Sequence, residues 1–199
     1  MKIGICSALA KELDHSLNYI GVDRGVEILI KQGIKPIYAI GDFDSIENQN
    51  LLTKLKIERL PTRKDVTDSH AALEYALLQG YDEIDIYGVT GGRLDHFFSV
   101  MCLLEKYQSV KIRVIDSQNI IELLKPCKHK IMNDGYKYFS LFALKDSYID
   151  IEHAHYPLHN YYLKHDDPLC VSNQTIEDFA YVTNSETIIL IRSRDKSDI

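Results

Sequence analysis

Two aspartates stand one residue apart in the run GDFDS at residues 41–45, which directly follows the apolar segment 37–40. Carboxylates this close repel each other unless a cation neutralises them, and Mg²⁺ binds carboxylate oxygens together with substrate phosphates. Asp42 and Asp44 are therefore candidate ligands of a magnesium ion. A solvated Asp-rich turn would carry the same residues, so this run alone leaves both interpretations open.

A second acidic run, KDVTD at residues 64–68, opens the segment with the clearest helical periodicity. The purely structural interpretation is a helix start. Thr67 or Asp65 would cap the helix, and the helix dipole would stabilise the negative charge of Asp68 in the first turn. The alternative adds Asp65 and Asp68 to the metal site of the first run and lets Lys64 meet a phosphate.

A third run, GVTGGRLDH at residues 88–96, has the pattern of a glycine-rich loop between a strand and a helix. Backbone N–H groups at such a helix start attract phosphate, and Gly91 and Gly92 allow it to approach closely. Arg93 adds a planar fork of donors for phosphate oxygens. The loop matches neither GxxxxGK nor GxGxxG, so it carries no common nucleotide fingerprint.

The elements that must position these runs alternate along residues 1–118. Apolar and β-branched runs predict strands at 2–6, 19–22, 37–40, 57–60, 84–87 and 111–115, and periodicity predicts helices at 24–32, 46–56, 67–79 and 94–107. This alternation predicts an α/β domain with a parallel, Rossmann-like sheet. Ligands of such sheets bind beyond the carboxyl ends of the strands, where the three runs would gather.

The pattern changes in residues 119–199, which we assign to a second domain. Predicted strands at 119–124, 128–131, 136–144, 148–153 and 187–192 are separated by turn residues, with no helical period. This part is predicted to be a small antiparallel β-sandwich. His153 and His155 would share a strand face, but no Cys or carboxylate completes a zinc spacing, so we interpret them as strand and turn residues.

Composition narrows the class of protein. The chain has 199 residues and a formal net charge of −6, with no basic tail, which disfavours a nucleic-acid partner. No apolar run reaches the length of a membrane helix, and the N-terminus lacks the long apolar core of a signal peptide. The four cysteines form no CxxC unit and are expected to be reduced, so we predict a cytoplasmic protein.

Taken together, the motifs resemble those of the thiamine pyrophosphokinase family. The matching elements occur in the family's order and are VDRG at 22–25, GDFDS at 41–45, KDxTD at 64–68, GxxGGRxDH at 88–96 and Ser172-Asn173. The resemblance implies an α/β catalytic domain followed by a β-sandwich that helps to bind thiamine. It also implies transfer of the pyrophosphoryl group of ATP to thiamine with Mg²⁺, in a homodimer with active sites at the subunit interface.

The resemblance also assigns residues. It implies metal ligands at Asp42, Asp44 and Asp68 with Asp65 as a helper, nucleotide contacts at Asp23, Lys64, Gly91, Gly92, Arg93 and Asp95, and thiamine contacts at Ser172 and Asn173. The fitting mechanism is in-line attack of the thiamine hydroxyl on the β-phosphorus of ATP, with catalysis mainly by positioning and electrostatics. The base for that hydroxyl is Asp68 or Asp95, and a metal-bound carboxylate is the poorer base.

Two residues depart from the family pattern. Arg24 stands where many relatives have glycine, and the chain has no Trp, which some relatives use against thiamine. A Tyr or Phe would then stack on the substrate.

Other classes of protein remain as alternatives. The Asp42/Asp44 pair also suits a haloacid-dehalogenase-like phosphatase, in which the first aspartate is the nucleophile, but that leaves GGRxDH unexplained. A DxD glycosyltransferase would be unusually short. A binding sensor that kept the fold and lost activity is expected to have lost an acid, whereas all the matching acids are present.

Overall fold

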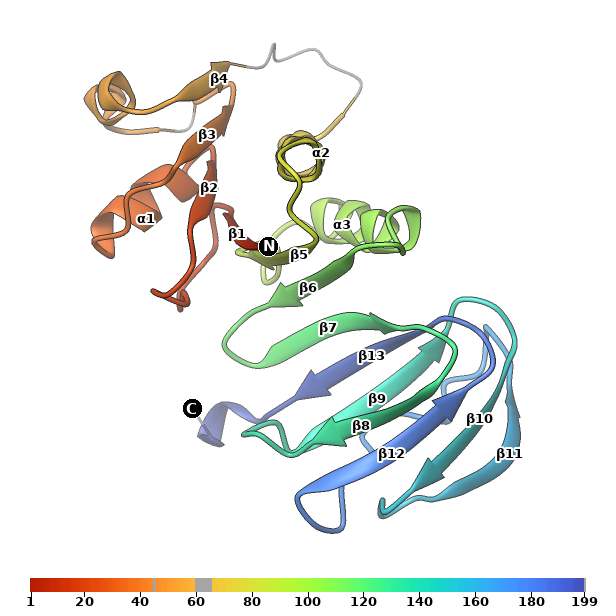
Figure 1. The fold of residues 1–199 in the computed structure, drawn as a ribbon. Helices are drawn as coiled ribbons and strands as arrows, with labels where there is room; N and C mark the ends of the chain where they lie inside the picture. The colour runs from red at the N-terminus through yellow and green to blue at the C-terminus, as the bar shows by residue number, and fades with distance from the viewer. Residues whose placement is uncertain (45, 60–65, 199) are drawn as a thin grey trace. The chain divides into compact units, whose positions relative to one another are not determined.

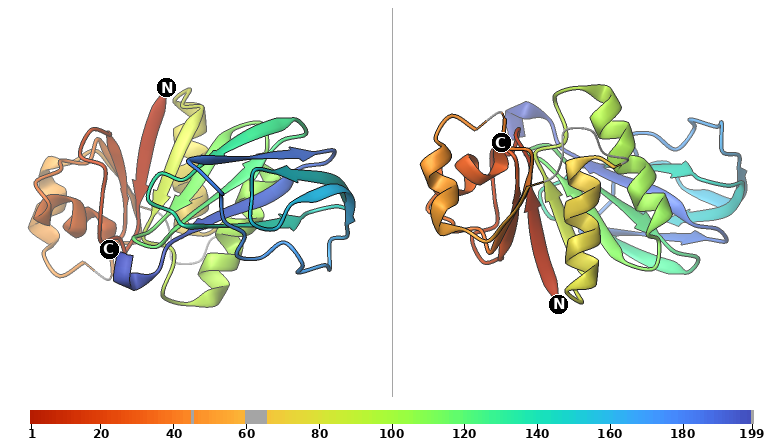
Figure 2. Two further views of the ribbon diagram at one scale, coloured as in Figure 1. Left: turned by 90° about the horizontal axis from the view of Figure 1, so that it is seen from below. Right: turned by 90° about the horizontal axis from the view of Figure 1, so that it is seen from above.

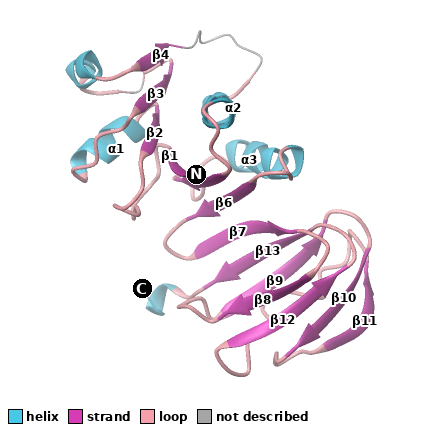
Figure 3. Ribbon diagram, viewed as in Figure 1, coloured by secondary structure: helices cyan, strands magenta, loops and turns pink. Residues whose placement is uncertain are grey.

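The computed structural model describes residues 1–44, 46–59 and 66–198, which form two compact units, Met1–Asp116 and Ser117–Ile199. Figure 1 shows the course of the chain through both units. In Figure 3 the helices α1, α2 and α3 all belong to the first unit, while the second consists of strands and loops apart from a short 3₁₀-helix, η2 (Lys196–Asp198). No described helix is long and apolar enough to cross a membrane.

The first unit alternates strands and helices. Its elements are β1 (Lys2–Cys6), β2 (Tyr19–Val22), α1 (Gly25–Lys31), β3 (Tyr38–Gly41), the 3₁₀-helix η1 (Gln49–Lys54), β4 (Ile57–Arg59), α2 (Asp68–Leu78), β5 (Glu83–Tyr87), α3 (Leu94–Lys106) and β6 (Lys111–Ile115). Within this unit the strand order is β4-β3-β2-β1-β5-β6 and every pairing is parallel. The predicted parallel α/β arrangement is therefore confirmed.

Packing on both faces explains why the central strands are so apolar. Ile3, Ile5 and Ile84 are fully buried, as expected for a parallel sheet covered on two sides. The helix α1 packs on β1 and β2, and α2 packs on β1, β2 and β3. In Figure 2, α2 runs alongside β1 when the structure is seen from above.

The strand order fixes where a ligand can bind. The chain runs outward from β1 to β4 and then returns through α2 to β5 on the other side of β1. This reversal creates a switch point between β1 and β5, and the crevice beyond the carboxyl ends of the strands at such a point is the usual ligand site. Because all six strands are parallel, the loops after β2, β3 and β5 leave the sheet at the same edge.

One predicted helix is wrong in type and length. Residues 46–56 were expected to be α-helical, but the structure has only η1, which begins at Gln49. The amides of Glu47 and Asn48 donate to the side chain of Glu27 instead of entering a helical turn. Ile46 is buried in the core, which anchors the segment in an extended conformation.

The start of α2 matches one of the two predicted caps. The hydroxyl of Thr67 accepts the amide of His70 at 3.3 Å, so Thr67 caps the helix. The other candidate cap, Asp65, lies outside the described residues. Gly80, with φ +83°, follows the helix in the left-handed conformation that glycine adopts at little cost.

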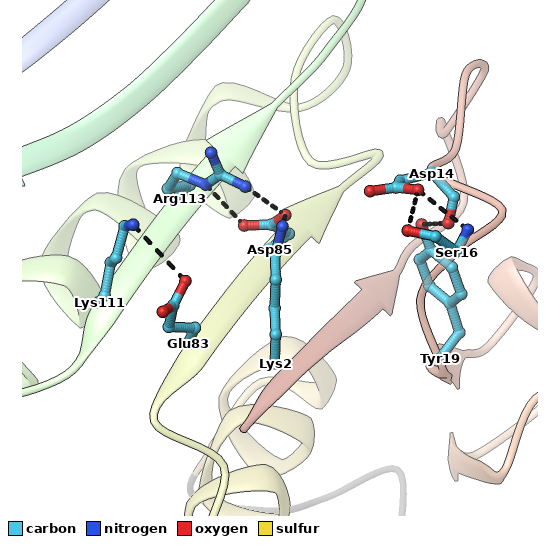
Figure 4. A network of polar contacts seen from close by, with 8 residues as sticks. All are labelled: Lys2, Asp14, Ser16, Tyr19, Glu83, Asp85, Lys111 and Arg113. Carbon is cyan, nitrogen blue, oxygen red and sulfur yellow. Dashed lines mark hydrogen bonds and ion pairs between the residues drawn. The ribbon is translucent and has the colours of Figure 1, made fainter.

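A charged group lies buried on one face of the sheet. Asp85 on β5 is 2% exposed, and its carboxylate accepts hydrogen bonds from Nε and Nη2 of Arg113 on β6, at 2.8 and 2.7 Å. The ammonium of Lys2 on β1 lies 2.9 Å from the same carboxylate. Figure 4 shows the two cations converging on Asp85. Paired in this way, the carboxylate links three neighbouring strands.

The second unit is made of two antiparallel sheets. Its strands are β7 (Asn119–Leu124), β8 (Lys128–Met132), β9 (Tyr138–Ala143), β10 (Ser147–Glu152), β11 (Leu158–Leu163), β12 (Phe179–Asn184) and β13 (Ile188–Ser193). One sheet runs β7-β13-β9 and the other β11-β10-β12-β8. Apolar residues of both sheets share one core, including Leu141 on β9 and Ile149 on β10. The predicted antiparallel unit is confirmed in this form.

Two strands of this unit escaped prediction for physical reasons. β11 lies at the edge of its sheet and is largely exposed, so its sequence lacks a buried apolar stripe. β12 alternates correctly, but the residues that it buries are Ala180, Val182 and the polar Asn184.

The expectation that His153 and His155 share a strand face is wrong. β10 ends at Glu152, and His153 has φ +58°, which turns the chain out of the strand. Among the residues that the structure describes, no group of three His, Cys, Asp or Glu side chains is arranged to hold a metal ion.

Candidate active site

The loop after β3 holds its two aspartates on either side of a buried ring. Phe43 is fully buried in a core cluster with Val26 and Ile46, although its φ of +59° is unusual for a bulky residue. Asp42 is half-buried and Asp44 is exposed. The carboxylate of Asp42 accepts the amide of Asp44 at 3.2 Å. The buried phenylalanine thus anchors the loop that presents both carboxylates.

Asp23, which follows β2, contacts this loop directly. Its carboxylate accepts the amide of Phe43 at 3.4 Å, and its own amide donates to the carbonyl of Ile40 at 3.1 Å. A side chain at Gly41 would place its Cβ 1.8 Å from the Asp23 carboxylate, so only glycine fits there. The residue that the resemblance places near the nucleotide therefore also shapes the loop of Asp42 and Asp44.

The glycine-rich loop after β5 rests on the segment that follows β1. Gly88, with φ +79°, approaches so closely that an added Cβ would lie 2.4 Å from the amide nitrogen of Ala10. An added Cβ on Gly92 would lie 2.5 Å from the side chain of Leu9, whereas one on Gly91 would meet no atom within 4 Å. Backbone contacts thus require glycine at 88, whereas the exposed Leu9 side chain could shift away from a Cβ at 92, and Gly91 leaves the turn open on one side.

Arg93 and Asp95 form a forked pair at the start of α3. The guanidinium donates to both carboxylate oxygens, with Nε–Oδ1 at 3.1 Å and Nη2–Oδ2 at 2.5 Å. The hydrogen bond from Arg93 lowers the pKa of Asp95 to about 2, and the amide of His96 contributes in the same direction. Both side chains are exposed, at 74% and 62%. Asp95 is thus a weak base, and Arg93 is oriented by its neighbour.

The start of α2 is fixed by contacts with the far end of α3. His70 Nε2 lies 3.1 Å from the hydroxyl of Tyr107, which in turn donates to Glu74 at 2.8 Å. Tyr107 follows the last residue of α3, whereas Arg93 precedes its first. A helix of this length spans about 20 Å, so the anchor of α2 and the Arg93–Asp95 pair lie at opposite ends of α3.

The predicted acidic cluster is therefore brought together only in part. Asp42 and Asp44 lie on one loop with Asp23 against it, but Asp68 does not join them in a three-ligand group among the described residues. Lys64 and Asp65 lie outside those residues. Mg²⁺ often uses only one or two protein carboxylates, with phosphates and water completing its shell, so the hard oxygen donors of Asp42 and Asp44 fit this ion.

The second unit has an apolar cavity of about 340 Å³, which is in the size range of small-molecule sites. It is lined by side chains of β10, of the start of β11 and of the segment before β12: Ile151, Tyr156, Leu158, Leu169, Cys170, Val171, Ser172 and Asn173. Two of the lining residues are the predicted thiamine contacts Ser172 and Asn173. Tyr156 and Leu169 join them: a stacking Tyr or Phe was expected without a position, and Leu169 was not singled out.

Asn173 is buried and shapes the rim of this cavity. It is 4% exposed, its side-chain oxygen accepts the amide of Tyr156 at 3.1 Å and its side-chain nitrogen donates to the carbonyl of the same residue at 2.8 Å. The ring of Tyr156 is 67% exposed. Ser172 has φ +59° and its amide donates to Ser140 Oγ at 3.0 Å. Asn173 thus holds the backbone of Tyr156, whose exposed ring lies beside the apolar cavity.

Comparison with known proteins gives consistent results over the whole chain. The family model described as "Thiamin pyrophosphokinase, catalytic domain" matches residues 8–115, and that described as "Thiamin pyrophosphokinase, vitamin B1 binding domain" matches residues 128–189. The chain is 37% identical over 195 residues to a thiamine pyrophosphokinase of Bacillus subtilis, which covers 92% of this chain and 89% of the relative.

Solved structures show the same likeness. The crystal structure of a thiamine pyrophosphokinase from Bacillus subtilis aligns with a TM-score of 0.87 at 32% identity, covering 98% of this chain and 100% of that chain. The crystal structure of a thiamin pyrophosphokinase from Geobacillus thermodenitrificans aligns with a TM-score of 0.88 at 31% identity, covering 100% of both chains. The phosphatase and the silent sensor considered from the sequence receive no support from these relatives.

Proposed function

Since this chain belongs to the thiamin pyrophosphokinase family, we propose that it transfers the pyrophosphoryl group of ATP to the hydroxyl of thiamine, releasing AMP. One observation carries the proposal to the level of residues. The Asp42-Asp44 loop and the glycine loop that ends at Arg93 leave the same edge of one parallel sheet, which also has the strand reversal expected of a Rossmann-like nucleotide site.

Asp42 and Asp44 are the residues that would hold Mg²⁺, with Asp65 and Asp68 as further candidates. The ion, when bound, would neutralise negative charge on the phosphate oxygens of ATP. Asp44 is exposed and Asp42 half-buried, so the chain offers one carboxylate to solvent and fixes the other. Asp23 keeps the loop in this conformation through the amide of Phe43.

Arg93 is the residue that would grip the transferred phosphates. Its guanidinium is exposed, and its Nε and Nη2 are held by Asp95, which limits the freedom of the side chain. Nη1 and the second N–H of Nη2 are the donors that would meet phosphate oxygens. Backbone amides of Gly91 and Gly92 lie at the start of α3, where phosphate binds readily. Lys64 would add a point charge at the same substrate. Catalysis then rests on positioning and electrostatic stabilisation.

The low pKa of Asp95 bears on the choice of base. A carboxylate with a pKa of about 2 accepts a proton from a hydroxyl poorly. We therefore assign to Asp95 the role of orienting Arg93, and Asp68 remains the candidate for the base.

Thiamine would bind at the apolar cavity of the second unit. The cavity suits the apolar faces of a small heterocycle, and the exposed ring of Tyr156 lies at its rim, where it can stack on a flat substrate. Tyr156 would thus take the place of the Trp that this chain lacks. Asn173 contributes by holding the backbone of Tyr156 at both its amide and its carbonyl.

We further propose that the protein is a homodimer in which each active site combines the acidic loop of one chain with the cavity of the other. The support is that the acids and the cavity belong to different units, together with the family resemblance. A C₂ dimer would create two identical shared sites. The cytoplasmic location predicted from the sequence remains a prediction.

Complementation tests the shared site. A chain carrying Asp44→Asn is mixed with one carrying Asn173→Ala, each expected to be nearly inactive alone, under conditions that allow subunit exchange, and AMP release from ATP is followed with thiamine and Mg²⁺. Shared sites leave one intact site in each mixed dimer, so activity should rise to about a quarter of the wild-type value. Activity that stays at the sum of the two separate variants would place each site within one chain.

A further inference from the structure

The connection from β2 to α1, together with the first turn of α1, contacts the loop of Asp42 and Asp44 and the chain that follows it at two points. At one point Asp23 binds the amide of Phe43, between the two candidate metal ligands. At the other point Glu27, on the first turn of α1, binds the chain beyond the loop. Its Oε1 accepts the amides of Glu47 at 2.9 Å and Asn48 at 3.1 Å. The two acids are four residues apart and together bracket the segment that carries Asp42 and Asp44.

Glu27 is an unusual place for a charge. It is 4% exposed, and its second oxygen, Oε2, has no hydrogen-bond partner among the described residues. A buried carboxylate is costly unless a cation compensates it. The guanidinium of Arg24 lies 3.9 Å from Oε2 and also 3.4 Å from the carboxylate of Glu47. The guanidinium of Arg24 therefore lies near the carboxylates of both Glu27 and Glu47.

The loop needs such support because of its own conformation. Phe43 and Asp23 both have positive φ, at +59° and +47°, and residues in this region cost free energy that the surrounding structure must offset. The buried ring of Phe43 supplies one restraint. Glu27 supplies another, because two hydrogen bonds to a charged oxygen are stronger than bonds to a neutral acceptor.

We infer that Glu27 is a positioning residue of the active site, which, together with Arg24, fixes the loop of Asp42 and Asp44 in the conformation that binds the metal–nucleotide substrate. This inference rests on the proposed function of that loop. Glu27 acts through the backbone amides of Glu47 and Asn48 and touches no substrate. A partner that orients a metal ligand without touching the metal commonly changes affinity by about 10- to 100-fold.

Two variants separate the hydrogen bonds from the charge. Glu27→Leu keeps the side-chain volume and removes both acceptor oxygens, so it avoids leaving a cavity. Glu27→Gln keeps one acceptor oxygen and removes the charge. The matched control is Asp85→Leu, which makes the same kind of exchange at another buried acid of the same unit, on β5. That acid has Arg113 and Lys2 as partners, and its ion pairs among the described residues do not reach the loop.

Amide hydrogen exchange gives the direct readout. The amides of Glu47 and Asn48 should be protected in the wild-type protein, and Glu27→Leu should speed their exchange by about 10-fold or more, since a local opening costs less once the acceptor is gone. Glu27→Gln should retain most of the protection, and Asp85→Leu should leave these two amides unchanged even if it lowers the melting temperature. Unprotected amides in the wild-type protein overturn the inference without any variant.

Calorimetry with Mn²⁺ and a non-hydrolysable ATP analogue gives the second readout. Glu27→Leu should weaken binding of this complex by about 10-fold, Glu27→Gln by less, and Asp85→Leu not at all. Equal binding by Glu27→Leu and the wild-type protein, with faster exchange at Glu47, would show that the hydrogen bonds of Glu27 are structural only and would overturn its active-site role. Failure of the wild-type protein to bind the complex would instead contradict the metal role proposed for Asp42 and Asp44.

Discussion

The two units differ in the kind of candidate binding site that each contains. In the first, the candidate functional groups are charged, largely exposed and carried by loops that the half-buried Asp23 and the buried Glu27 hold through hydrogen bonds. In the second, the candidate site is an apolar cavity whose rim is fixed by a buried amide, that of Asn173. Under the proposed function, oriented charged side chains would bind the polyanionic substrate, and a preformed apolar cavity would bind the heterocyclic one.

The largest expected effect lies in the first unit. Asp44→Asn should reduce the rate of AMP release by at least about 10²-fold, as does the loss of one electrostatic group that acts in a transition state. The fold should survive, because Asp44 is exposed. Steady-state kinetics at saturating Mg²⁺ together with a melting curve measure both quantities. Near-normal turnover would remove Asp44 from the site, whereas a lost melting transition would show a structural role.

The buried ion pair of the same unit should matter for stability and little for binding. Arg113→Met removes one of the two cations beside the buried carboxylate of Asp85 and leaves Lys2 as its ion-pair partner among the described residues. The protein should lose stability, but less than the roughly 3 kcal/mol or more that a fully uncompensated buried charge costs. Urea denaturation measures this loss. The double variant Arg113→Met with Asp85→Leu should recover part of it, because no charge is then left buried. A single variant as stable as the wild-type protein would contradict the role of the pair.

The Arg93–Asp95 pair sharpens the distinction between an orienting acid and a base. The depressed pKa of Asp95 keeps this carboxyl ionised above about pH 2, so its interaction with Arg93 is present throughout the neutral range and is lost only as the pH falls through that value. Asp95→Asn should lower kcat/KM by about 10-fold through misplacement of Arg93.

The pH profile provides the test of this assignment. Asp95→Asn should leave any acid limb of kcat/KM in place, since a carboxyl with a pKa of about 2 does not produce it. Disappearance of that limb in the variant would make Asp95 the base. Arg93→Lys serves as the matched control, because it keeps the charge beside Asp95 and removes only the fork.

A smaller effect is expected in the second unit. Tyr156→Ala should raise the KM for thiamine by about 3- to 10-fold, the loss of one aromatic contact, and should leave the KM for ATP unchanged. Tyr156→Phe should retain wild-type values, because the ring and not the hydroxyl makes the contact. An equal rise in both KM values would show that the residue supports the structure generally instead of binding thiamine.

The smallest effect concerns the cysteines. Burial raises the pKa of Cys6 to about 12 and that of Cys170 to about 11, so both thiols remain protonated and unreactive at pH 8. Cys102 and Cys127 are exposed and should be alkylated first by iodoacetamide, with activity unchanged. Mass spectrometry of digested protein identifies the modified residues, and guanidinium-unfolded protein provides the control. Rapid alkylation of Cys170 in the folded protein would show that the cavity opens in solution.

Much of this description could be predicted from the sequence, because strand period, helix caps and glycine turns are local signals. The parallel strands, the α2 cap at Thr67 and the three motif loops follow from neighbouring residues. The exposed edge strand β11 carries no such signal, and β12, which buries the small Ala180 and the polar Asn184 beside Val182, carries a weak one.

The non-local contacts could not be predicted. Nothing in the sequence around Glu27 indicates that it accepts the amides of residues twenty positions later, where a helix was predicted and only the 3₁₀-helix η1 forms, from Gln49. Likewise, the resemblance implied a thiamine contact at Asn173 but gave no indication that its buried side chain also holds the backbone of Tyr156. Such roles depend on which segments the fold brings together.

Phosphorus NMR of the reaction products tests the central claim most directly. The protein is incubated with ATP, Mg²⁺ and thiamine, and the spectra are recorded over several turnovers. The account predicts thiamine diphosphate and AMP in equal amounts, formed only when thiamine is present. Formation of ADP with thiamine monophosphate, or release of inorganic phosphate without thiamine diphosphate, would contradict the proposed pyrophosphoryl transfer.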